Sequence, residues 1–134
     1  MTIRKVSAVV LFVQDLNKCM MFYRDTLGIP VTFSDPVSYA FRFEDQDFAI
    51  VNIATAVGMV GEQALGLDQA ASHRVMMCAD VEDVDAVYHA LTAKGLEFVR
   101  PPVSKPWGYR TAYFADPEGN LWELRQSIPV EQAT

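Results

Sequence analysis

The stretch VEDVDAVYHALTAKGLEFV, residues 81–99, decides the fold because it repeats the pattern of VQDLNKCMMFYRDTLGIPVTF, residues 13–33. Each copy has an aspartate before an amphipathic stretch, a glycine near its end and an extended segment after it. The aspartates, Asp15 and Asp83, are 68 residues apart, and the two glycines are 67 residues apart. A near-constant offset over elements of the same type predicts a duplicated supersecondary unit.

Both copies predict a helix with one buried face. Asp15 and Asp83 are suitable N-cap residues, and Gly28 and Gly95 are suited to the C-terminal ends. Apolar side chains recur at helical spacing in each copy. They are Leu16, Cys19, Met20, Tyr23 and Leu27 in the first helix, and Val84, Val87, Tyr88 and Leu91 in the second.

The segments around the helices predict strands. They are residues 5–13, 30–34, 38–44 and 48–53 in the first half, and 74–81, 96–103, 108–115 and 121–126 in the second. Each half therefore has the order strand, helix and three strands. We expect an α+β fold of two βαβββ modules, with helices on the outside and curved mixed sheets that form a cleft.

The chain of 134 residues is expected to be a single domain. Module 1 covers about residues 5–53, and module 2 covers about residues 72–127. Residues 54–71 are rich in small side chains and are expected to connect the modules, with a helical turn near 62–67. Residues 128–134 are expected to form a loose tail.

Composition limits the partners and the location of the protein. A net charge of −6 and a pI of about 4.7, without clustered Lys or Arg, argue against nucleic acid. The apolar run Ala8–Val13 is too short to span a membrane. The N-terminus lacks a signal-peptide pattern, so a cytoplasmic location is expected. Cys19 and Cys78 are expected to be buried free thiols.

Residues 106–124, PWGYRTAYFADPEGNLWEL, predict the last hairpin. Its turn lies at Asp116–Asn120. Pro117 presets φ, Gly119 supplies a positive φ, and the Asp116 side chain can accept hydrogen bonds from backbone N–H groups.

This segment resembles the last hairpin of the vicinal oxygen chelate superfamily, which includes glyoxalase I, bleomycin-resistance proteins and extradiol dioxygenases. The motifs Val13–Leu16, Phe22–Tyr23 and Leu27–Gly28 are similar to the family's opening strand and helix. The resemblance covers about residues 6–127 and is closest to the bleomycin-resistance branch. It implies paired βαβββ modules, a homodimer and a cleft inside the curved sheets.

The resemblance also implies four metal-ligand positions, on the first and last strands of each module. Glu123 fills one of them. Ala8 and Met76 fall at the first-strand positions and supply no hard donor, and Asn52 is the weak alternative on the remaining strand. A second way of counting places His73 at a ligand position. We therefore expect no cofactor, with one divalent metal ion bound by His73 and Glu123 as the alternative.

A cleft without a metal predicts a slot for a planar molecule. The predicted ligand-binding residues are Phe12, Phe41, Trp107, Tyr109, Arg110 and Glu123. Arg110 and Glu123, on adjacent predicted strands, are expected to form an internal ion pair.

Three functions remain open. The preferred one is metal-free binding of an aromatic or amphiphilic small molecule in the cleft. The second is a divalent-metal-dependent, glyoxalase-like lyase or isomerase. The third is an interaction domain whose cleft is filled by its own side chains. The sequence assigns no catalytic residue.

Overall fold

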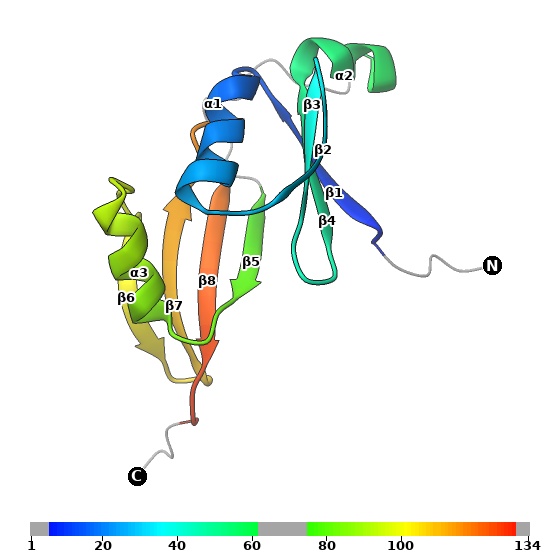
Figure 1. Ribbon diagram of the computed structural model, residues 1–134. Helices are drawn as coiled ribbons and strands as arrows, with labels where there is room; N and C mark the ends of the chain where they lie inside the picture. Colours follow the sequence, from blue (N-terminus) through cyan, green and yellow to red (C-terminus); the bar gives the residue numbers. More distant parts are fainter. Residues whose placement is uncertain (1–5, 62–74, 131–134) are drawn as a thin grey trace, which may run out of the picture. The chain divides into compact units, whose positions relative to one another are not determined.

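The computed structural model describes residues 6–61 and 75–130 (Figure 1). The chain divides into two compact units, residues 1–69 and 70–134, and each is described by itself. Each unit has a strand, a helix and three further strands, which form a four-stranded mixed sheet. The predicted α+β fold of two βαβββ modules is confirmed.

Unit 1 follows the predicted order of elements. They are β1 (Ala8–Val13), α1 (Leu16–Met21), a π-helical turn η1 (Phe22–Thr26), β2 (Val31–Asp35), β3 (Ser38–Arg42), β4 (Asp47–Asn52) and α2 (Ile53–Val60). The sheet order is β1-β4-β3-β2, with β1 parallel to β4 and the other pairs antiparallel. Asp15 caps α1 by accepting a hydrogen bond from the backbone N–H of Lys18 at 3.0 Å.

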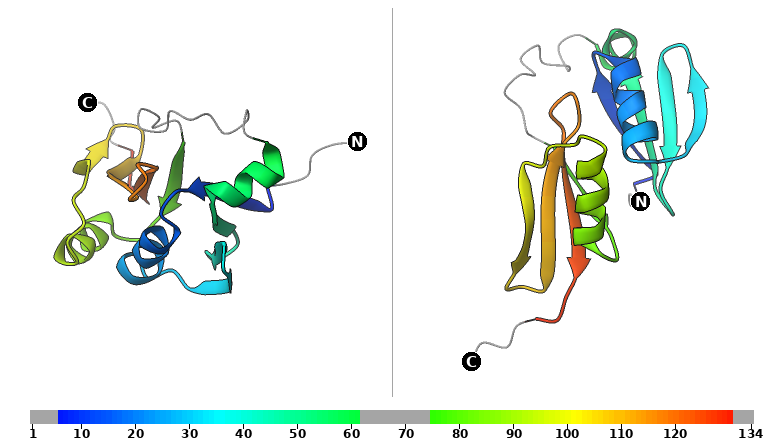
Figure 2. Two further views of the ribbon diagram at one scale, coloured as in Figure 1. Left: turned by 90° about the horizontal axis from the view of Figure 1, so that it is seen from above. Right: turned by 60° about the vertical axis from the view of Figure 1, so that its left-hand side comes forward.

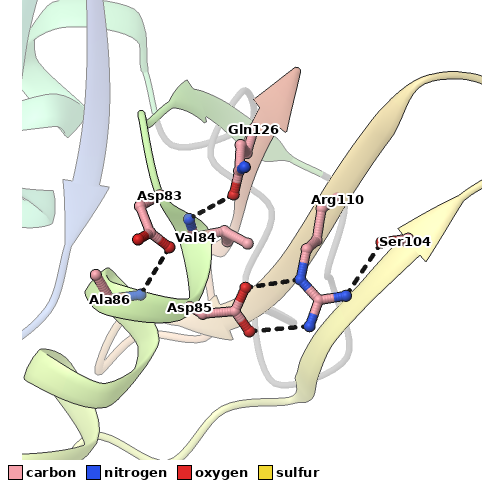
Figure 3. Close-up of polar contacts among 7 residues, drawn as sticks. All are labelled: Asp83, Val84, Asp85, Ala86, Ser104, Arg110 and Gln126. Carbon is pink, nitrogen blue, oxygen red and sulfur yellow. Dashed lines mark hydrogen bonds and ion pairs between the residues drawn. The ribbon is translucent and has the colours of Figure 1, made fainter. Parts of the chain in front are cut away.

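Unit 2 repeats this plan. Its elements are β5 (Met76–Asp80), α3 (Val84–Ala93), β6 (Arg100–Lys105), β7 (Tyr109–Ala115) and β8 (Leu121–Ser127), in the sheet order β5-β8-β7-β6. The helix α3 lies along one face of this sheet (Figure 2). Two side chains cap its first turn (Figure 3). Asp83 accepts a hydrogen bond from the backbone N–H of Ala86 at 3.1 Å, and Gln126 accepts one from the backbone N–H of Val84 at 2.9 Å.

Aromatic rings fill the core between helix and sheet in each unit. In unit 1, the ring centre of Tyr23 lies 5.7 Å from that of Phe41 and 5.0 Å from that of Phe48. In unit 2, the ring centre of Phe114 lies 5.5 Å from that of Phe98 and 6.2 Å from that of Trp122. These contacts identify the helix-covered face of each sheet.

Two of the boundaries that differ from the sequence-based expectation have a clear local cause. Helix α2 begins at Ile53, because the Asn52 side chain accepts the N–H of Ala54 at 2.8 Å and so caps a helix where an irregular connection was expected. Strand β6 begins at Arg100 and not at Leu96, because the N–H of Leu96 bonds to the C-terminal end of α3. The turn predicted near residues 62–67 lies outside the described residues.

The turn between β7 and β8 has the predicted chemistry. Asp116 Oδ1 accepts the backbone N–H groups of Glu118 and Asn120, each at 2.9 Å, and its Oδ2 accepts the Asn120 amide at 2.9 Å. Gly119 has a φ of +86°, as expected. Asp116 is only 5% exposed, so these bonds are shielded from water.

Ile128, the first residue after β8, is hydrogen-bonded, and residues 131–134 of the predicted loose tail lie outside the described residues. The N–H of Ile128 bonds to the carbonyl oxygen of Gly108 at 3.0 Å. Gly108 has a φ of +100°, and a Cβ atom there would lie 3.0 Å from Val130.

Among the described residues, no helix has the length and apolar character needed to cross a bilayer.

Candidate functional site

The sheet of unit 2 has an open face on the side opposite α3. Strand alternation directs Phe114 toward the helix and Tyr113 away from it. Cross-strand pairing extends this open face over the neighbouring strands. The side chains on this face include Met76, Cys78 and Asp80 of β5, Arg100, Val103 and Lys105 of β6, Tyr109, Thr111 and Tyr113 of β7, and Leu121, Glu123 and Arg125 of β8.

Glu123 lies at the centre of a hydrogen-bonded group on this face. The hydroxyl of Tyr113, its direct cross-strand neighbour, donates to Glu123 Oε2 at 2.5 Å. Cys78, its neighbour on β5, lies close enough to Glu123 for this carboxylate to raise the pKa of the thiol. The bond to Glu123, helped by partial burial, raises the pKa of Tyr113 above its usual range, so the phenol remains a donor.

Cys78 differs from the sequence-based expectation of a buried thiol. Both cysteines are free, but Cys19 is buried and Cys78 is exposed. Partial burial of the thiol, and then the charge and hydrogen bond of Glu123, raise the pKa of Cys78. Although water reaches this residue, its thiol is therefore mostly protonated at neutral pH.

This environment predicts how Cys78 reacts. Replacing Glu123 with glutamine removes a negative charge, so the pKa of Cys78 is expected to fall and alkylation by iodoacetamide to shift to lower pH. Below the pKa, each unit of decrease raises the thiolate fraction roughly tenfold. Mass spectrometry at several pH values measures the rate, with buried Cys19 as the internal control. An unchanged pH profile would show that Glu123 does not act on the thiol.

The other end of the open face carries cations over aromatic rings. Arg125 donates from Nε to Asp80 at 3.0 Å, and its guanidinium carbon lies 4.8 Å from the ring centre of Tyr109. Lys105 Nζ lies 5.9 Å from the ring centre of Trp107. Trp107 is 66% exposed in the turn between β6 and β7, so its ring is accessible to a ligand.

Thr111 is a polar residue without a partner on this face. It is 3% exposed, and its hydroxyl makes no hydrogen bond in the described parts of the chain, although it lies near enough to Tyr113 to lower the pKa of the phenol. A buried hydroxyl without a partner costs free energy, and such groups are uncommon in native proteins.

The predicted ion pair between Arg110 and Glu123 is wrong. Arg110 lies on the helix-covered face, where Nε and Nη2 donate to the two carboxylate oxygens of Asp85 at 2.7 and 2.9 Å (Figure 3). Its Nη1 also contacts Ser104 Oγ at 3.1 Å. The bond from Arg110 lowers the pKa of Asp85. Arg110 therefore fastens the first turn of α3 to β7 and does not belong to the open face.

The predicted site residues of unit 1 lie on opposite faces of its sheet. Phe41 is 0% exposed and packs against Tyr23 of the helix, so the structure places it in the core and away from any ligand-facing surface. Phe12 is half-buried and lies on the other face, beside Val51 of β4. Val10, two residues before it, is 42% exposed on the same face.

The described residues do not fit a divalent metal ion. No group of three or more His, Cys, Asp or Glu side chains gathers within residues 6–61 and 75–130. Asp47, the β4 neighbour of Ala8, is paired with Arg42 at 2.7 Å, and Asn52 is used as a helix cap. On the open face of unit 2, Glu123 stands among thiol, thioether and phenol groups, which suit a hard cation poorly. His73 lies outside the described residues.

Comparisons with known proteins agree with this fold. The chain is 32% identical over 127 residues to the uncharacterized protein YraH of Bacillus subtilis (strain 168), covering 92% of this chain and 99% of YraH. A glyoxalase/bleomycin resistance protein/dioxygenase from Nocardioides has a TM-score of 0.84 at 25% identity, over 100% of this chain and 91% of that chain. TnmS3, an antibiotic binding protein from Streptomyces sp. CB03234, has a TM-score of 0.71 at 24% identity, over 95% and 98% of the two chains.

The sequence pattern of one family covers nearly the whole chain. Residues 5–124 match the model of the Glyoxalase/Bleomycin resistance protein/Dioxygenase superfamily. This range includes every described strand except the last residues of β8, together with all the helices. The chain therefore belongs to the glyoxalase/bleomycin resistance protein/dioxygenase superfamily.

Proposed function

We propose that this protein binds an aromatic or amphiphilic small molecule, without a metal, on the open face of its second sheet. The observation that carries the proposal is the composition of this face. It combines the exposed ring of Trp107 at its edge and the half-buried ring of Tyr109 with polar groups at Glu123 and Arg125. Small-molecule sites commonly pair aromatic surface with a few oriented polar groups.

The comparisons support a binding role. TnmS3 shares the fold and is an antibiotic binding protein, which is the kind of role that the sequence predicts for the bleomycin-resistance branch. The expected homodimer, the cytoplasmic location and a ligand-enclosing cleft between the modules stay predictions.

A ligand screen tests the proposal. We expect some planar amphiphiles to raise the melting temperature of the full chain, because a ligand at a hundred times its Kd stabilises the folded state by about 2.7 kcal/mol. The same compounds should change Trp fluorescence saturably, and this change should be reduced in Trp107→Phe, which leaves the buried Trp122 in place. A broad panel without stabilising compounds would contradict the proposal.

Metal analysis separates this role from the lyase or isomerase alternative. The proposal predicts that protein purified without chelator carries no stoichiometric divalent ion. Stoichiometric uptake of such an ion that disappears in Glu123→Ala would instead support the metal-dependent enzyme, with His73 and Glu123 as its candidate ligands.

A further inference from the structure

The guanidinium of Arg125 is held on two sides and open on a third. Its Nε donates to Asp80, and its plane lies near the Tyr109 ring. Neither Nη atom has a hydrogen-bond partner in the described residues, and the side chain is 36% exposed. The Asp80 side chain is 81% exposed, so this ion pair is weak. The two Nη atoms therefore form a fork that suits a planar carboxylate.

Glu123 supplies an acceptor on the same strand. Its carboxylate accepts a hydrogen bond from the Tyr113 hydroxyl, and Cys78 is its neighbour on β5. An ionised carboxylate has about four acceptor sites, so a further donor can be accommodated. Because the side chain is only half-buried, a ligand hydroxyl can reach it. The Glu123 carboxylate can therefore accept a hydrogen bond from a hydroxyl group of the ligand.

The spacing of these two groups limits the size of the ligand. Glu123 and Arg125 are two residues apart on one face of β8, which corresponds to roughly 6.5–7 Å along the strand. The guanidinium leans toward Tyr109, which pairs with Ser127 and so lies on the side away from Glu123. Two small substituents on adjacent carbons of a ring are therefore too close together to reach both Glu123 and Arg125. A ligand that contacts both residues must carry its two polar groups farther apart.

We propose that the open face of unit 2 selects a planar aromatic acid with a hydroxyl group at the end opposite its carboxylate. The carboxylate pairs with the Nη atoms of Arg125, and the hydroxyl donates to Glu123. The ring lies flat against the sheet between them, beside Thr111 and Tyr113 of β7. This inference rests on the proposed binding function and adds the chemical class of the ligand.

Four related compounds provide the first measurement on the wild-type chain. The probe 4-hydroxycinnamate carries both groups, its methyl ester lacks the charge, cinnamate lacks the hydroxyl, and tyramine carries a cation instead. By isothermal titration calorimetry, we expect the ester and cinnamate each to bind roughly tenfold more weakly than 4-hydroxycinnamate, as loss of about one charge-assisted hydrogen bond requires. Tyramine should bind more weakly than the acid.

Two variants then assign each preference to its residue. Arg125→Met should remove the preference for acid over ester and keep the preference for the hydroxyl. Glu123→Met should remove the preference for the hydroxyl and keep the preference for acid over ester. The comparison of variants with ligand analogues has the form of a double-mutant cycle. Circular dichroism and the melting temperature verify folding, and the wild-type comparison does not depend on either variant.

The failing outcomes are distinct. Equal binding of acid and ester, tighter binding of tyramine, or an acid preference that survives in Arg125→Met would overturn the ligand class while other planar compounds still bind. Absence of binding by 4-hydroxycinnamate together with the whole planar panel would overturn both this inference and the proposed function.

Discussion

Replacing Phe41 with alanine is expected to lower the free energy of unfolding by about 3–5 kcal/mol, the usual cost of deleting a buried aromatic ring. Phe41 is 0% exposed, and its ring centre lies 5.7 Å from that of Tyr23 and 6.1 Å from that of Phe48. Its removal leaves a cavity between the π-helical turn η1, which carries Tyr23, and the sheet of unit 1. Urea unfolding followed by circular dichroism measures the loss.

Phe12→Ala is the matched control, since it deletes the same ring from the opposite face of the same sheet. Phe12 is half-buried, so a clearly smaller loss is expected. Equal losses in the two variants would mean that both faces are packed alike. A loss below about 1 kcal/mol for Phe41→Ala would remove Phe41 from the core.

This contrast shows what the sequence could predict about the faces. Strand alternation places Tyr39 on the same face as Phe41, and Tyr109 on the same face as Tyr113, because side chains on a strand alternate with a period of two. It does not say which group faces the helix. In unit 1 the group with Phe41 faces the helix, whereas in unit 2 the group with Tyr113 faces away from it.

The misplacement of Arg110 has the same cause. Arg110 and Glu123 lie on adjacent strands, and without the register their side chains could be assigned to one face. The register pairs Glu123 with Tyr113, whose side chain points to the face opposite that of Arg110. The actual partner of Arg110 is Asp85. The sequence feature that could have indicated it is the acidic residue in the first turn of α3, because a side chain there can reach the strand beneath the helix.

The open face was only partly predictable. Glu123 and Tyr109, which both lie on this face, are among the predicted ligand-binding residues, Glu123 through the family resemblance. Cys78, Tyr113 and Arg125 were missed as site residues because their roles depend on cross-strand neighbours: Cys78 and Tyr113 flank Glu123, and Arg125 reaches Tyr109 diagonally. The caps at Asp15 and Asp83 and the turn at Asp116–Asn120 were predicted well, because they depend on residues close in the sequence.

Asp116→Ala is expected to cost roughly 2–4 kcal/mol, because it leaves the backbone N–H groups of Glu118 and Asn120 without their acceptor in a shielded turn. The Asp116 carboxylate accepts both of these groups and the Asn120 amide at 2.9 Å. Urea unfolding measures the loss. Hydrogen exchange should also show faster exchange at the β7–β8 end that contains this turn.

Asp35→Ala is the control, because the Asp35 carboxylate also accepts hydrogen bonds within a hairpin turn, between β2 and β3 of unit 1. Its Oδ1 accepts the N–H of Val37 and the hydroxyl of Ser38, each at 2.9 Å, but the residue is exposed. Water can replace these bonds, so a clearly smaller loss is expected. Equal losses would mean that burial of Asp116 does not strengthen its turn. A larger loss for Asp116→Ala, with faster alkylation of Cys78, would show that the same turn holds Tyr113 opposite Glu123 and so maintains the open face.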